Sequence, residues 1–83
     1  MKDNKVNVEL IVPSIGKTYN VFIPINKTIG EVIVILNNSI NEMTGYFPIS
    51  NKLFLLNIVE NEIYRYDMEV KEKIRNGAIL ALI

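Results

Sequence analysis

Acidic side chains gather in the last third of the chain, where their carboxylate oxygens could in principle bind a hard cation such as Ca²⁺. Their spacing is not that of an EF-hand loop, and three cationic residues, Lys71, Lys73 and Arg75, interleave with them. The pattern therefore favours a solvated surface of mixed charge over a metal site. The acidic residues are Glu60, Glu62, Asp67, Glu69 and Glu72.

The residues that most enzymes use for acid–base or nucleophilic chemistry are missing from the sequence. It contains no histidine and no cysteine, which excludes Ser-His and Cys-His nucleophile pairs, thiolate metal sites and disulfide bonds. Gly16-Lys17-Thr18 has the residue types that end a phosphate-binding loop, but Ile11 stands where that motif requires its first glycine. We therefore expect no enzyme activity, no cofactor and no metal.

Length and charge narrow the classes of protein further. A chain of 83 residues is expected to form one domain, 1–83, with a single small core. Lys+Arg 9 balances Asp+Glu 9, whereas binding to nucleic acid needs a basic face. No apolar run approaches the roughly 18 residues of a membrane span, and the N-terminus is too polar for a signal peptide. We expect a cytoplasmic protein with no nucleic-acid partner and no membrane insertion.

A helix is predicted over residues 28–44. Thr28 and Glu31 have the spacing of a capping box, in which each side chain accepts a hydrogen bond from the backbone N–H of the other residue. Propensity opposes this helix because of Gly30 and the β-branched run that follows it, but the helical spacing of the apolar residues favours it. Val34 and Ile35 fall outside the apolar stripe. The stripe, which should form the centre of the core, consists of Ile29, Val32, Ile33, Leu36, Ile40 and Met43.

Two strands are predicted before the helix. Residues 5–12 alternate between inward apolar positions and a second face that carries Ile11, as in a half-buried strand. Gly16 suits the positive φ of a turn, and residues 18–25 follow as the second strand of a hairpin. Pro24 cannot donate a ladder hydrogen bond, so this strand should lie at an edge or end there.

Three more strands are predicted after the helix, over residues 52–59, 63–66 and 78–83. Tyr64 and Tyr66 are two residues apart and should point to one face of their strand. Packing of their rings is favoured over a role in recognition. The charged stretch before the last strand should be anchored to the core by Met68, Val70 and Ile74.

The order β-β-α-β-β-β and two motifs resemble those of ubiquitin-like β-grasp proteins. From Gly16 to Val32, Gly-Lys-Thr, an alternating strand and Thr-Ile-x-x-Val follow one another at the spacing found in ubiquitin. From Ile74 to Leu82, Ile-x-Asn-Gly-x-x-Leu-x-Leu is similar to the last turn and strand of that superfamily. The chain looks most like the YukD/EsaB-type proteins encoded with type VII secretion systems of Gram-positive bacteria. The resemblance implies an α+β fold in which one helix packs on a mixed sheet, with the first and last strands parallel.

The same resemblance implies a non-catalytic protein-interaction module, an accessory cytoplasmic component of a type VII secretion system. Its partner would be the membrane-bound secretion ATPase or another subunit of that machine. The alternative is a carrier or modifier of the sulfur-carrier type, in which a C-terminal Gly-Gly is activated and then conjugated. This sequence ends Ala81-Leu82-Ile83, and a bulky side chain beside the reacting carboxyl obstructs that chemistry. We therefore expect no conjugation.

Strand alternation predicts where a partner would bind. If Leu80 and Leu82 point into the core, the residues between them lie on the sheet face turned away from the helix. Soluble monomers seldom expose a large apolar patch without a binding role. Two alternatives stay open, because the loop around Tyr46 and Phe47, or a second copy of the chain in a homodimer, would also cover this face. The predicted partner-binding residues are Ile11, Phe54, Leu56, Ile79, Ala81 and Ile83.

Overall fold

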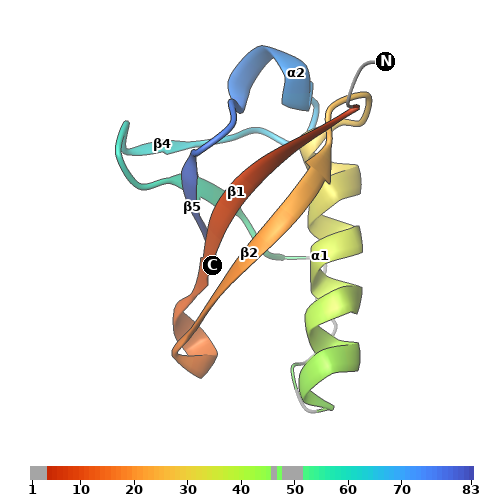
Figure 1. Ribbon diagram of the computed structural model, residues 1–83, viewed down its shortest axis with the longest axis vertical. Helices are drawn as coiled ribbons and strands as arrows, with labels where there is room; N and C mark the ends of the chain where they lie inside the picture. Colours follow the sequence, from red (N-terminus) through yellow and green to blue (C-terminus); the bar gives the residue numbers. More distant parts are fainter. Residues whose placement is uncertain (1–3, 46, 48–51) are drawn as a thin grey trace.

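The computed structural model describes residues 4–45, 47 and 52–83, which form a five-stranded sheet and one long helix (Figure 1). A 3₁₀ turn, η1 (Pro13–Ile15), joins the first two strands. In chain order the other elements are β1 (Lys5–Val12), β2 (Lys17–Pro24), α1 (Ile29–Thr44), β3 (Leu55–Asn57), β4 (Glu62–Ile63), α2 (Val70–Lys73) and β5 (Ile79–Leu82).

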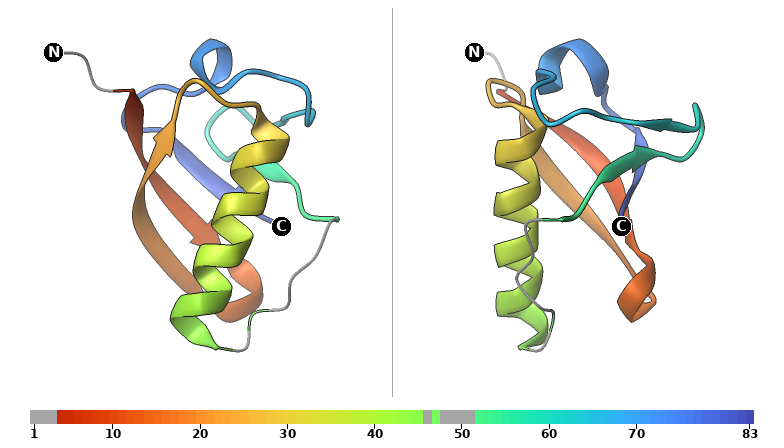
Figure 2. Two further views of the ribbon diagram at one scale, coloured as in Figure 1. Left: turned by 90° about the vertical axis from the view of Figure 1, so that its right-hand side faces the viewer. Right: turned by 180° about the vertical axis from the view of Figure 1, so that it is seen from behind.

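The sheet has the strand order β2-β1-β5-β3-β4. The two central strands, β1 and β5, are parallel, and every other neighbouring pair is antiparallel. Helix α1 lies across one face of this mixed sheet, while the short helix α2 lies at one end of it (Figure 2). This arrangement confirms the predicted β-grasp and the parallel pairing of the first and last strands. It also confirms that β2 ends at Pro24 and lies at an edge.

Helix α1 begins as the capping box predicts. The Thr28 backbone N–H donates to Glu31 Oε1 at 2.9 Å, and the Glu31 backbone N–H donates to Thr28 Oγ1 at 3.3 Å. The first of these bonds lowers the pKa of the exposed Glu31 carboxyl, because it stabilises the ionised form. The N–H groups of Ile29 and Gly30 donate to the carbonyl oxygens of Met68 and Tyr66. The segment after β4 therefore satisfies the free amides of the helix start.

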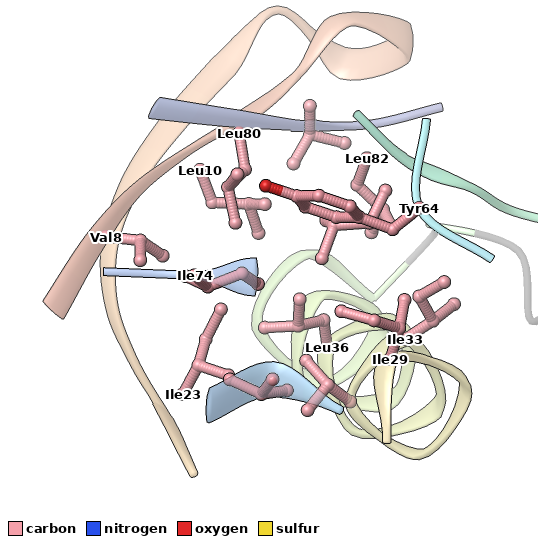
Figure 3. Packing of buried hydrophobic residues seen from close by; sticks show 14 of the residues in the cluster. Val8, Leu10, Ile23, Ile29, Ile33, Leu36, Tyr64, Ile74, Leu80 and Leu82 are labelled. Carbon is pink, nitrogen blue, oxygen red and sulfur yellow. The ribbon is translucent and has the colours of Figure 1, made fainter. Parts of the chain in front are cut away.

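The core lies between α1 and the sheet (Figure 3). All the stripe residues predicted to face the core are buried except Met43, whose side chain is 58% exposed. That prediction is wrong: Met43 lies in the last turn of α1, which extends past the end of β5 (Figure 2), so this central strand does not reach it. Val34 and Ile35 are exposed, as predicted. The stripe residues that are buried are Ile29, Val32, Ile33, Leu36 and Ile40.

The third and fourth strands are shorter than the predicted ranges 52–59 and 63–66. A turn ends β3, because Asn57 Oδ1 accepts from the Glu60 backbone N–H at 2.9 Å and Asn61 adopts a positive φ of 57°. After β4 the chain leaves the sheet edge and runs to the start of α1. Ladder pairing continues briefly before β3, since Phe54 and Ile83 exchange two backbone hydrogen bonds.

Tyr64 and Tyr66 do not share a face, because the strand ends before either residue. Tyr64 is buried in the core and accepts from Asn57 Nδ2 at 2.9 Å through its hydroxyl, which donates in turn to the Lys73 carbonyl oxygen at 3.4 Å. Burial raises the pKa of the Tyr64 hydroxyl. Tyr66 is 41% exposed, and its hydroxyl donates to the Leu53 carbonyl oxygen. Both rings nevertheless pack against the fold, as predicted.

The charged segment before β5 contains the short helix α2, which the sequence did not predict. Its anchoring was predicted correctly, because Val70 and Ile74 are buried and Met68 packs against the core as a partly buried side chain. The Val70 backbone N–H donates to the Lys27 carbonyl oxygen, and the Ile74 N–H donates to the Val70 carbonyl oxygen. The first of these bonds ties α2 to the chain just before α1, and the second closes the end of α2.

Candidate interaction surface

The sheet face opposite α1 carries a row of apolar side chains that crosses four strands. Ile11 of β1 pairs with Ala81 of β5, Ala81 pairs with Leu56 of β3, and Leu56 pairs with Ile63 of β4. Directly paired residues on neighbouring strands share a face, and their Cβ atoms lie roughly 5 Å apart. The pairing register therefore makes this row continuous, as the sequence predicts for its first three members.

Two further apolar pairs flank this row on β5 and the segment around β3. The Ile58 backbone N–H donates to the Ile79 carbonyl oxygen at 3.0 Å on one side. On the other side, Ile83 donates to the Phe54 carbonyl oxygen at 2.9 Å. Both pairs lie two residues from the central row and so point to the same face. We call the whole set the outer patch: Ile11, Phe54, Leu56, Ile58, Ile63, Ile79, Ala81 and Ile83.

The six predicted residues lie together on this face but differ in exposure. Phe54 and Ile83 are each 44% exposed, whereas Ala81 is only 2% exposed. Ala81 sits between the larger side chains of Ile11 and Leu56, which shield its single methyl group from water. Ala81 is therefore the floor of the outer patch, and its direct contact with a partner, as predicted, would need those neighbours to move. The remaining predicted residues are half-buried: Ile11, Leu56 and Ile79.

Ile58 and Ile63 belong to the outer patch, although they are not among the predicted residues. They are 44% and 55% exposed, so their exposed fractions equal or exceed those of the predicted residues. Residues two apart on a strand share a face, so the position of Leu56 was sufficient to predict that Ile58 lies on the same face. Ile63 had no such signal, because only the β3–β4 register places it beside Leu56.

Phe54 also contacts an aromatic ring of the protein itself, which leaves less of its surface open to a partner. Its ring stacks on that of Tyr66, with the centroids 5.5 Å apart and the planes 11° apart. Offset stacking of this kind contributes about 0.5–1.5 kcal/mol beyond simple burial. One face of the Phe54 ring is therefore occupied within the protein, and the outer patch ends on this side at an aromatic pair.

Polar groups border the outer patch on two sides. Glu9 of β1 pairs with Ile79 and, across the other edge of β1, with Asn20 of β2. A hollow of about 230 Å³ adjoins Ile79, and Lys73 and Arg75 contribute to its wall. The apolar centre and polar border are the anatomy expected of a surface for a protein partner.

The sites of chemistry considered from the sequence do not form in the described residues. Three residues of the acidic cluster form separate ion pairs: Arg65–Asp67 at 3.2 Å, Lys73–Glu62 at 3.2 Å and Lys71–Glu69 at 3.6 Å. Across residues 4–45, 47 and 52–83, no three acidic side chains come together to hold a metal ion. Gly16 has a φ of 64° and ends η1 in a strand-to-strand connection, whereas a phosphate-binding loop precedes a helix.

Two alternatives for what covers the outer patch were left open by the sequence, and the structure bears on only one of them. Phe47 is 4% exposed and belongs to the core cluster, so its side chain packs with the core and does not cover the outer patch. Tyr46 lies outside the described residues. Coverage by a second copy of the chain stays untested. Neither of the described helices is long and apolar enough to cross a lipid bilayer.

No family model and no curated protein matches this sequence. Solved structures do match the fold. A chain of the MycP5-free ESX-5 inner membrane complex superposes with a TM-score of 0.68 at 16% identity, over 98% of this chain and 21% of that chain. This protein therefore spans about a fifth of that neighbour's length.

Two other solved structures extend the comparison. A de novo design based on ubiquitin has a TM-score of 0.67 at 20% identity and covers 99% of this chain and 90% of the design. The ubiquitin-like domain of EccD5 from Mycobacterium xenopi has a TM-score of 0.59 at 13% identity, over 98% of this chain and 97% of the domain. The chain has the ubiquitin-like β-grasp fold.

Proposed function

We propose that this protein is a non-catalytic protein-interaction module that binds its partner through the outer patch. The observation that carries the proposal is the continuous apolar row on a sheet face that no described helix covers. Exposing such a patch to water is unfavourable, and patches of this kind usually mark a protein–protein contact. Without histidine or cysteine, the acid–base groups of the chain are carboxylates, lysines and tyrosines, and the sequence shows no recognisable catalytic pairing among them.

We further propose that the module serves as an accessory cytoplasmic component of a type VII secretion system, of the YukD/EsaB type. Two features support this setting. The Ile74-Arg75-Asn76-Gly77 turn resembles that of the YukD/EsaB-type proteins, and the fold is shared with a chain of the ESX-5 inner membrane complex and with the EccD5 domain. The partner under this proposal is the secretion ATPase or another subunit that faces the cytoplasm.

The test is capture of the type VII secretion ATPase of the same organism, which is the partner under this proposal. The perturbed form is the double variant Ile58→Lys with Ile63→Glu, which places charge on the most exposed part of the outer patch without changing net charge. Phe54 is left intact, because its replacement would also break the stack on Tyr66. We expect the purified wild-type protein to bind the ATPase and the double variant to lose that binding while keeping a native circular dichroism spectrum.

The matched control is Val34→Lys with Ile35→Glu on the solvent side of α1. These residues are 59% and 40% exposed, close to the values for the outer-patch pair, and the charges introduced are the same. The control variant should bind as the wild type does. Equal binding by all three folded proteins would exclude the outer patch as the contact, and loss in the control alone would place the contact on α1.

A further inference from the structure

The two edges of the sheet differ in how they are protected against pairing with another strand. β4, at one edge, is only two residues long, and a very short edge strand is a common natural protection. β2, at the other edge, is eight residues long. Its residues 18–23 contain no charge, no proline and no glycine, while Lys17 and Pro24 stand at its two ends. The interior of the β2 edge therefore lacks the features that usually prevent strand addition.

The register shows which backbone groups of β2 face outward. Ile25 N–H donates to the Asn4 carbonyl oxygen, in line with the β1–β2 register. In an antiparallel ladder the residues that exchange hydrogen bonds alternate with residues that do not. Tyr19, Val21 and Ile23 therefore bond to β1. The N–H groups that point away from β1, where no described strand lies, are those of Thr18, Asn20 and Phe22.

We propose that a second copy of this chain pairs with β2 along this edge, joining the two sheets in an antiparallel, two-fold symmetric dimer. With Asn20 on the symmetry axis, the outward N–H groups of each copy meet the outward carbonyl groups of the other. Thr18 then lies opposite Phe22 of the other copy, an aromatic and β-branched pair of the kind that stabilises sheets. Phe22 is 68% exposed in the single chain, so this contact would give it a partner.

Charge and symmetry both suit a second copy at this edge. The formal net charge is zero, so two copies approach without overall repulsion. Antiparallel pairing also keeps the two Lys17 side chains at opposite ends of the contact. A two-fold contact uses the same edge of both copies and is closed, which leaves the short β4 edges outermost and limits assembly to a dimer. The outer patch on β5, β3 and β4 stays open in that dimer.

Amide hydrogen exchange of the wild-type protein, followed by NMR over a range of concentrations, tests the contact residue by residue. We expect exchange at Thr18, Asn20 and Phe22 to slow as concentration rises, together with a shift to dimer mass in sedimentation. Tyr19 and Val21 serve as internal references, because their amides are already bonded to β1. Fast exchange at the three outward amides at every concentration would overturn the proposal.

A charge variant provides the second test. Asn20→Lys with Glu9→Gln should weaken the dimer about fivefold or more, because like charges opposite one another across an antiparallel pair are destabilising and the second change removes the Glu9 carboxylate that pairs with residue 20. The matched control is Asn38→Lys with Glu9→Gln, which has the same change in charge at an exposed position on α1. Self-association that persists unchanged in Asn20→Lys with Glu9→Gln, or that Ile58→Lys with Ile63→Glu abolishes instead, would show that the contact does not use the β2 edge.

Discussion

Two alanine substitutions on α1 should have opposite effects on stability, although the residues are only two positions apart. Leu36 is 5% exposed and belongs to the core cluster, whereas Val34 is 59% exposed. Truncating a buried leucine to alanine costs about 2–5 kcal/mol. Replacing an exposed valine by alanine removes a β-branched residue from a helix and should add about 0.5 kcal/mol.

The total stability expected of a domain of this length makes this contrast measurable. At 0.05–0.15 kcal/mol per residue, a domain of this length has a free energy of unfolding of about 4–12 kcal/mol, so Leu36→Ala should remove a large share of it. Urea unfolding, monitored by circular dichroism at low protein concentration, gives both values by linear extrapolation. Low concentration keeps any dimer from contributing to the measured stability.

Particular outcomes would refute this description of α1. A cost below about 1 kcal/mol for Leu36→Ala would mean that the leucine is not packed between the helix and the sheet. A clear loss of stability in Val34→Ala would mean that a partner, or another part of the chain, covers the outer side of the helix. Equal effects from the two substitutions would contradict the orientation of the apolar stripe.

Four further predictions concern Gly30, Tyr64 and Glu31. Gly30→Ala should lower the melting temperature despite its better helix propensity, because the new Cβ would lie 3.2 Å from Tyr66 Cβ and 3.3 Å from the Tyr66 carbonyl oxygen; a rise in melting temperature would show that this contact is loose. Tyr64→Phe should cost about 1–3 kcal/mol in urea unfolding, because it leaves the buried Asn57 amide without its acceptor. Two pH effects should appear in thermal melts. The pKa of Tyr64 is raised in the fold, so its contribution to the free energy of unfolding is complete below its ordinary pKa of 10.0 and declines as pH rises above that value. Tyr64→Phe should remove this dependence. Because the pKa of Glu31 is lowered in the fold, its contribution to the free energy of unfolding is present above pH 4.5 and declines as pH falls below that value. Glu31→Gln should reduce this dependence.

The local elements of this fold could be predicted from the sequence because their signals are local. The Thr28 and Glu31 spacing located the start of α1 even though the β-branched run after Gly30 favours a strand. That prediction succeeded because a capping box and a continuous stripe of buried residues together outweigh several small propensity terms. Alternation likewise identified the inward and outward residues of β1 and β5.

The composition of the candidate surfaces depended on tertiary structure, because it follows from which strands become neighbours. Ile63 joins the outer patch only through the β3–β4 register, and Ala81 is buried only because larger residues flank it on both sides. Met43 follows the helical stripe but is exposed, since the last turn of α1 extends past the end of β5. The outward direction of the Asn20 amide likewise depends on how β2 pairs with β1. Local sequence patterns specify the face of each element, whereas the pairing of distant segments decides which of those faces meet, which are covered and which stay open to a partner.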